Sequence, residues 1–250
     1  MQPLLTAPGL QALSQLMRRR VLFAFDLDGT LAPIVDHPAD ARVPDAIAER
    51  LRQLVMSAPV AVVTGRSVAD ARSRLGFRPH YLVGNHGAEG LWPLADSEGL
   101  QKLRARWRDG GAELSEAGIV LEDKQFSLAL HFRQSPDPQH ALAAIQAWLH
   151  PLPPDLSTLG GKAVVNVLRR AAPDKADAVL HLLGLSGCES LFFAGDDVND
   201  ESVFERARPD WLTVRIGSPA AASRARYCLE QPEALEPVLD LILHRLSALG

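Results

Sequence analysis

The run of five apolar residues at 21–25, VLFAF, is the feature that most constrains the fold. A strand with polar side chains at alternate positions can leave one face in water, but this run has none, so both faces must be buried. Strands of this kind lie in parallel sheets that helices cover on both sides. Similar runs follow at 60–64 and 190–195, with helical segments between them. The sequence therefore predicts an α/β protein with a doubly wound, Rossmann-like parallel-sheet core.

Further segments fit the same alternation. In residues 43–57, Ile47, Leu51 and Leu54 recur at helical spacing. We also expect the following core elements: a short helix before the first strand, helices starting at Ser67, at Asp174 and near Leu235, and strands within 80–87 and 211–217.

The middle of the chain has a different pattern, best seen in residues 126–133 (FSLALHFR), where apolar residues alternate with small or polar ones. Such a strand belongs to a sheet that helices cover on one face only. Helices at 99–114 and 137–150, and strands at 118–123 and around a hairpin turn at Gly160–Gly161, complete the order α-β-β-α-β-β. We therefore expect an inserted α+β (αββαββ) cap domain at 94–171, within a core domain formed by 1–93 and 172–250.

Composition and charge exclude several classes of partner. The 250 residues carry a net charge of −4, so no basic surface points to nucleic acid. Two cysteines are too few for a disulfide framework, no run is long enough to span a bilayer, and the N-terminus lacks the order of a signal peptide. We expect a cytoplasmic monomer that binds a small molecule and neither nucleic acid nor membrane.

Two carboxylates follow the first apolar run directly, in DLDGT. Asp26 and Asp28 are two positions apart on an extended chain, so they point to the same side and repel each other unless a counter-charge lies between them. Oxygen ligands of this kind suit Mg²⁺. Beside a bound phosphate, Asp26 is placed to attack phosphorus and Asp28 to donate and accept the proton. The alternative is a strand that ends in a polar turn.

A second acidic cluster, GDDVNDE, follows the apolar run at 190–195. Some of its four carboxylates can cap a helix, but capping does not need four. Asp196 comes first after the strand and is the best candidate metal ligand. Asp200, one turn later, is expected to reach the metal through water.

Four other residues are candidates with an ordinary structural alternative each. Thr64 ends a strand and can hold a phosphate oxygen, or belong to a helix cap. Arg66 can contact phosphate or sugar, or form a surface ion pair. Lys175 opens a helix, where a cation is unfavourable without an anion beside it, but it can also pair with a neighbouring aspartate in solvent. His86, between glycines, is a candidate substrate contact or a structural histidine.

In this order, DLDGT, Thr64, Lys175 and GDD resemble the haloacid dehalogenase-like phosphatases. The segments FAFDLDGTLAPI, VVTGRS, GNHGAE, LEDKQFSLALHFR, GGKAVVNV and GDDVNDESVF resemble the trehalose-6-phosphate phosphatases within them. The resemblance implies Mg²⁺-dependent hydrolysis of trehalose 6-phosphate through an aspartyl-phosphate. It makes Asp26 the nucleophile and Asp28 the general acid/base, whose backbone carbonyl also binds Mg²⁺ with Asp26 and Asp196. It assigns the phosphate to Thr64 and Lys175.

The same resemblance assigns the sugar hydroxyls to four residues of the inserted segment: Glu122, Lys124, Lys162 and Asn166. The first two share a strand face by spacing, as do the last two, although exposed charged residues are the ordinary alternative. The family usually has glutamate where this chain has Asn166. Because of Asn166, the alternative substrate is another sugar or disaccharide phosphate. Two other functions stay open: a phosphomannomutase-like phosphotransfer, which uses the same two carboxylates and a similar cap, and an inactive sugar-phosphate sensor.

Overall fold

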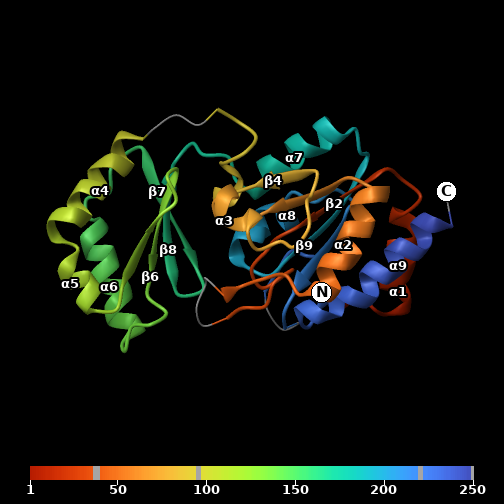
Figure 1. Cartoon of the computed structure of the whole chain (residues 1–250), viewed down its shortest axis with the longest axis horizontal. Helices are drawn as coiled ribbons and strands as arrows, with labels where there is room; N and C mark the ends of the chain where they lie inside the picture. The colour runs from red at the N-terminus through yellow and green to blue at the C-terminus, as the bar shows by residue number, and fades with distance from the viewer. Residues whose placement is uncertain (36–39, 94–96, 219–221, 249–250) are drawn as a thin grey trace. The chain divides into compact units, whose positions relative to one another are not determined.

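The computed structural model describes residues 1–35, 40–93, 97–218 and 222–248, and the chain divides into two compact units (Figure 1). Unit 1 consists of Met1–Gly90 and Pro173–Gly250, and unit 2 of Leu91–Ala172. The sequence predicts a domain boundary after residue 93. This point adjoins residues 94–96, which lie outside the described residues.

Unit 1 is built on a seven-stranded sheet whose strands are all parallel, which confirms the predicted core. Its order is β1-β11-β10-β9-β2-β3-β4. From β2 the chain first adds strands on one side, β3 and β4, and later on the other, β9 to β11. The order therefore reverses between β2 and β9, where doubly wound sheets bind ligands. The strands are β1 Gln2–Pro3, β2 Val21–Phe25, β3 Val60–Val63, β4 Tyr81–Val83, β9 Ser190–Gly195, β10 Leu212–Ile216 and β11 Tyr227–Leu229.

Helices cover both faces of this sheet (Figure 1). On one face, Phe23, Phe25 and Phe192 are fully buried in a core shared with α1, α2 and α9. On the other, Phe193 packs edge-on against Phe204 of α8, with ring centroids 5.8 Å apart. The helical elements are α1 Ala7–Leu16, α2 Asp45–Ser57, α3 Val68–Arg72, η2 Asn85–Gly87, α7 Lys175–Ser186, η3 Val198–Asp200, α8 Glu201–Glu205, η4 Pro232–Ala234 and α9 Leu235–Ser247.

The strands β1 and β11 were not expected from the sequence, where residues 1–20 predict only a helix. Gln2 and Pro3 of β1 pair with Tyr227 and Cys228 of β11 at the edge of the sheet. Strands of two and three residues are too short to show an alternating pattern.

Unit 2 contains a four-stranded antiparallel sheet in the order β5-β6-β8-β7, as the αββαββ pattern predicts. Leu128 and Leu130 of β6 pair with Val167 and Val165 of β8, and these four side chains form one core with the helices. The elements are α4 Glu98–Gly110, α5 Ala112–Glu116, β5 Val120–Asp123, β6 Ser127–His131, α6 Pro138–Leu149, β7 Leu156–Gly161 and β8 Val164–Arg169.

The hairpin turn between β7 and β8 lies two residues later than expected, so the prediction of a turn at Gly160–Gly161 is wrong. Both glycines lie inside β7, and Lys162 and Ala163 form the turn. Ala163 takes the positive φ of 58° that we expected of a glycine. Its carbonyl accepts a hydrogen bond of 3.0 Å from the backbone N–H of Phe132. This hydrogen bond continues the ladder in which His131 of β6 pairs with Val164 of β8, so the register with β6, and not the glycine pair, accounts for the position of the turn.

Within the described ranges, no helix combines the length and the apolar character that crossing a membrane requires. Both cysteines, Cys188 and Cys228, are present as free thiols.

Candidate active site

Three buried carboxylates meet at the point where the strand order of unit 1 reverses. Asp26 follows β2, Asp196 follows β9, and Asp200 ends η3. One oxygen of each lies within 4.8 Å of the others. Their exposed fractions are 5%, 3% and 0%, in a region where unpaired charges are costly. The two acidic clusters therefore converge on one site.

The turn after β2 brings Asp196 close to the first cluster. Gly29 in this turn has a φ of +81°, which residues with a side chain rarely adopt. A Cβ atom at Gly29 would lie 2.1 Å from Oδ2 of Asp196, so a side chain does not fit there. The glycine of DLDGT thus lets the second carboxylate approach the backbone of the first loop.

Lys175 supplies the counter-charge within the site. It is the first residue of α7, it is 2% exposed, and its Nζ lies 2.9 Å from Oδ1 of Asp26. It also donates a hydrogen bond of 2.7 Å to Oδ1 of Asp200. Burial alone would lower the pKa of Lys175, but the charges of Asp200 and Asp26 outweigh burial and raise it. The lysine is therefore a buried ammonium, and the alternative of a solvated lysine is wrong.

The neighbouring aspartates are engaged elsewhere. Asp174 and Asp177 form a capping box at the start of α7, and each also pairs with Arg206 at 2.7 Å. In the second acidic cluster, Asp197 caps η3, and Glu201 pairs with Arg215 at 2.8 Å. Capping thus explains part of each acidic stretch.

The charges of the site favour a divalent cation. The pKa of Asp26 lies well above its usual value, chiefly because the carboxyl is buried. The charge of Lys175 lowers this pKa in part, and the charges of Asp200 and Asp196 raise it. Three carboxylates face one ammonium, an excess of two negative charges when all are ionised. In an octahedral Mg²⁺ site, opposite oxygen ligands are about 4.2 Å apart, since each bond is about 2.1 Å long. Three buried carboxylates with oxygens within 4.8 Å of one another form a cluster of oxygen donors that can hold a metal ion of this type.

Thr64 and His86 lie on adjacent loops at the same end of the sheet. Thr64 follows β3 and is fully buried, and its Oγ1 accepts a hydrogen bond of 3.2 Å from the backbone N–H of Arg66. The backbone N–H of His86, in η2, donates to the carbonyl of Thr64 at 2.9 Å. A Cβ at Gly87, whose φ is +117°, would lie 2.2 Å from the carbonyl oxygen of Asp174. The loop that bears His86 therefore abuts the start of α7.

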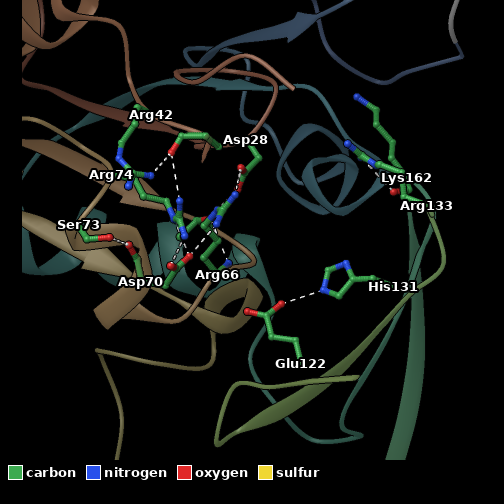
Figure 2. A network of polar contacts seen from close by, with 12 residues as sticks. Asp28, Arg42, Arg66, Asp70, Ser73, Arg74, Glu122, His131, Arg133 and Lys162 are labelled. Atoms are coloured by element: carbon green, nitrogen blue, oxygen red, sulfur yellow. Dashed lines mark hydrogen bonds and ion pairs between the residues drawn. The ribbon is translucent and has the colours of Figure 1, made fainter. Parts of the chain in front are cut away.

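Asp28 pairs with Arg66 (Figure 2). Nε of Arg66 donates to Oδ2 of Asp28, and Nη2 donates to Oδ1, both at 2.6 Å. The Arg66 side chain is 12% exposed and that of Asp28 is 34% exposed, so this ion pair is partly buried. Burial alone would lower the pKa of Arg66, but its hydrogen bonds and charge attraction to Asp28 and Asp70 raise it. The arginine that we expected at phosphate or sugar thus holds the proposed acid/base.

In unit 2, two of the four candidate residues share one face of the sheet. Glu122 pairs with Ala129, which in turn pairs with Asn166, so the three side chains point to the same side. Oε2 of Glu122 lies 2.8 Å from Nε2 of His131 (Figure 2) and 3.7 Å from Nζ of Lys124.

The other candidate of the hairpin, Lys162, lies in the turn before β8 and not on its strand face. Its carbonyl oxygen is 3.5 Å from Nη2 of Arg133. The strand β8 begins only at Val164, so the spacing argument that placed Lys162 and Asn166 on one strand face does not apply to Lys162.

Sequence reasoning missed three residues of these networks: His131, Asp70 and Arg74. The partner of His131 lies on the adjacent strand, so no local pattern shows it. Arg66, Asp70 and Arg74, however, follow one another at intervals of four residues, which is the spacing of helical ion pairs. That signal was available in the sequence.

Comparison with known proteins agrees with this geometry. The chain is 33% identical over 243 residues to a probable trehalose-phosphate phosphatase of Sinorhizobium fredii (strain NBRC 101917 / NGR234), covering 92% of this chain and 90% of that protein. It is 28% identical to the trehalose-phosphate phosphatase of Mycobacterium marinum (strain ATCC BAA-535 / M), covering 90% of this chain and 62% of that protein.

Among solved structures, the C-terminal domain of C. albicans trehalose-6-phosphate phosphatase has the same fold, with a TM-score of 0.81 at 22% identity over 98% of both chains. The family model for trehalose-phosphatase matches residues 24–232, a range that contains all the candidate residues described above. The chain therefore belongs to the trehalose-phosphatase family of the haloacid dehalogenase superfamily.

Proposed function

We propose that this protein is a Mg²⁺-dependent phosphatase that hydrolyses trehalose 6-phosphate to trehalose and phosphate. The observation that carries the proposal is the position of Asp26, a buried carboxylate held by Lys175 beside Asp196 and Asp200. Membership of the trehalose-phosphatase family supports the choice of substrate. In this proposal unit 1 carries the chemistry and unit 2 selects the sugar.

The metal would be held by Asp26, Asp196 and the backbone carbonyl of Asp28. Both oxygens of Asp200 already accept hydrogen bonds, Oδ1 from Lys175 at 2.7 Å and Oδ2 from the backbone N–H of Asp197 at 2.9 Å. This engagement supports contact between Asp200 and the metal through water. When bound, Mg²⁺ offsets negative charge on the phosphoryl group and on the carboxylates around it.

The first step is attack by the Asp26 carboxylate on phosphorus, with cleavage of the bond between phosphorus and the sugar oxygen. Lys175 contacts Oδ1 of Asp26, so we assign the attack to Oδ2. Protonated Asp28 gives its proton to the departing sugar oxygen. The products of this step are free sugar and an aspartyl-phosphate on Asp26.

The second step releases phosphate. Asp28, now ionised, takes a proton from a water molecule whose oxygen attacks phosphorus, and the bond from phosphorus to Asp26 breaks. The ammonium of Lys175 and the hydroxyl and loop amides at Thr64 hold the phosphoryl oxygens in both steps. We propose that Arg66 and His86 line the substrate site beside them.

For the sugar, we propose that Glu122, Lys124, Lys162 and Asn166 bind the hydroxyl groups. Glu122 and Asn166 share a sheet face, which supports a joint role. An asparagine there can both donate and accept hydrogen bonds, whereas the glutamate usual in the family accepts only. Asn166 therefore favours a different set of hydroxyl contacts and makes another phosphorylated disaccharide the second candidate substrate.

The test is a panel of phosphate esters, assayed for phosphate release with and without Mg²⁺. We expect trehalose 6-phosphate to be the best substrate, no release without Mg²⁺, and no turnover by Asp26→Asn with the fold intact. Equal cleavage of sucrose 6-phosphate or mannose 6-phosphate would refute the assignment to trehalose. Transfer of phosphate within a bisphosphorylated sugar would indicate a phosphomannomutase-like enzyme. No hydrolysis of any ester, including an aryl phosphate, would leave an inactive sensor.

We also propose that the protein is a cytoplasmic monomer. Its two free cysteines are compatible with a reducing compartment. Sedimentation in solution tests the monomer, and localisation of a tagged full-length chain tests the compartment.

A further inference from the structure

The side chain of Asp28 is held by a series of alternating charges that continues away from the site (Figure 2). Its two oxygens accept from two nitrogens of Arg66, in a bidentate arrangement that fixes both the position and the plane of a carboxylate. Asp28 lies on a turn after β2, and its side chain is 34% exposed. Packing alone does not fix the orientation of the Asp28 carboxylate, and the contact with Arg66 does.

Arg66 is in turn held by Asp70 of α3. The remaining guanidinium nitrogen, Nη1, donates to Oδ2 of Asp70 at 2.7 Å. An arginine side chain has several rotatable bonds, and ordering it costs conformational entropy. A contact on each side of the guanidinium, to Asp28 and to Asp70, removes that freedom.

Arg74, at the other end, fixes Asp70 with a second bidentate pair. Its Nε donates to Oδ2 of Asp70 at 2.8 Å, and its Nη2 donates to Oδ1. Its Nη1 donates to the carbonyl of Ala41 at 3.2 Å, and its own backbone carbonyl accepts from the N–H of Val43. The side chain of Arg74 is 9% exposed, so this end of the series is anchored in the body of unit 1.

We propose that Asp70 and Arg74 are positioning residues, which keep Arg66 where it orients the Asp28 carboxylate for proton transfer. Asp70 lies between two arginines, so loss of its charge leaves two like charges as neighbours and drives Arg66 away from its place. Burial opposes ionisation of Asp70, but its hydrogen bonds with Arg74 and Arg66 lower its pKa, in agreement with a fixed, charged link. This inference rests on the proposed phosphatase function.

The test separates proton donation from the rest of catalysis by the choice of leaving group. 4-Nitrophenyl phosphate has a weakly basic leaving group, whose oxygen departs with little help from a proton donor. Phenyl phosphate has a more basic leaving group, whose oxygen depends more on protonation by Asp28. First-turnover rates are measured with Mg²⁺ for the full-length wild type and for Asp70→Asn. We expect Asp70→Asn to slow phenyl phosphate by about tenfold or more and 4-nitrophenyl phosphate by less than about twofold.

Two further variants control the test. Arg74→Lys keeps the charge but loses the forked contact, so it should show a smaller loss with the same selectivity, and it carries the test alone if Asp70→Asn does not fold. Asp240→Asn breaks a bidentate pair with Arg50, at 2.8 and 3.0 Å between α9 and α2, and should leave both rates unchanged.

Equal slowing of both esters by Asp70→Asn would show a merely structural role and overturn the inference, as would no slowing of either. If the wild type cleaves the aryl esters but not trehalose 6-phosphate, the substrate assignment fails while this test remains decisive. If it cleaves no ester at all, the proposed function fails and the inference with it.

Discussion

Replacing Lys175 by methionine removes the ammonium that lies among the three buried carboxylates and leaves an unbranched apolar side chain one atom shorter. Its Nζ lies 2.9 Å from Asp26 and 2.7 Å from Asp200. At an effective dielectric constant of about 20, each such contact is worth about 6 kcal/mol before desolvation. Desolvation of the ammonium offsets several kcal/mol of that attraction. Removing one partner from a buried ionic group is expected to cost about 3–5 kcal/mol of unfolding free energy.

Hydrogen exchange of the amides in β2 and β9, measured without metal, reports the opening free energy of unit 1 separately from that of unit 2. The matched control is Arg206→Met, which also removes a cation held by two carboxylates at the start of α7, but one that is 44% exposed. Exposed pairs contribute about 0–1 kcal/mol, so this variant should lose far less stability.

Saturating Mg²⁺ should restore much of the stability lost by Lys175→Met, because a divalent cation then offsets the carboxylates. Titration calorimetry should show tighter Mg²⁺ binding to this variant than to the wild type, since a competing positive charge is gone, while phosphate release is lost. The reasoning is refuted if Lys175→Met loses no more stability than Arg206→Met, or if its Mg²⁺ affinity falls.

Three further outcomes are expected. Gly29→Ala forces a side chain into the left-handed region, at about 1–2 kcal/mol, and against Asp196, so Mg²⁺ affinity measured by calorimetry should fall. Asp196→Asn should abolish the rise in thermal midpoint on adding Mg²⁺; a rise equal to that of the wild type contradicts its role as a ligand. Hydrogen bonds from Arg104 lower the pKa of Asp123, so the ionised carboxylate stabilises the fold. The loss of unfolding free energy in Asp123→Asn, measured by urea unfolding, should therefore be constant above about pH 5 and shrink below about pH 4.

Apart from β1 and β11, the sequence predicted the strands of the two sheets, because burial of both faces or of one face of a strand leaves a clear pattern of apolar residues. Residues 21–25 are apolar at every position and are fully embedded. In β6, Leu128 and Leu130 face the helices as their alternation indicates. The position of the hairpin turn was wrong because a hydrogen bond to another strand, which no local pattern contains, determines it.

Within the site, the sequence indicated which residues take part but not which ones touch. Lys175 was predicted to need an anion, yet its partners, Asp26 after β2 and Asp200 at the end of η3, are distant in the sequence and emerge only from the topology. Arg66 was expected at the substrate, but its ion pairs with Asp28 and Asp70 were not expected. Pairings between distant loops depend on the order of strands in the sheet, which residue patterns alone do not specify.

The chain leaves unit 1 after the loop that bears His86 and returns just before α7, two places already in contact at Gly87 and Asp174. When an inserted segment joins two points of a chain that already lie together, the entropic cost of closing it grows slowly with its length, by roughly 0.6 kcal/mol for each doubling. The parallel sheet can therefore accept grafts of quite different size between these points. Exchanging that one segment would offer a route to new carbohydrate preferences with the phosphoryl chemistry left untouched.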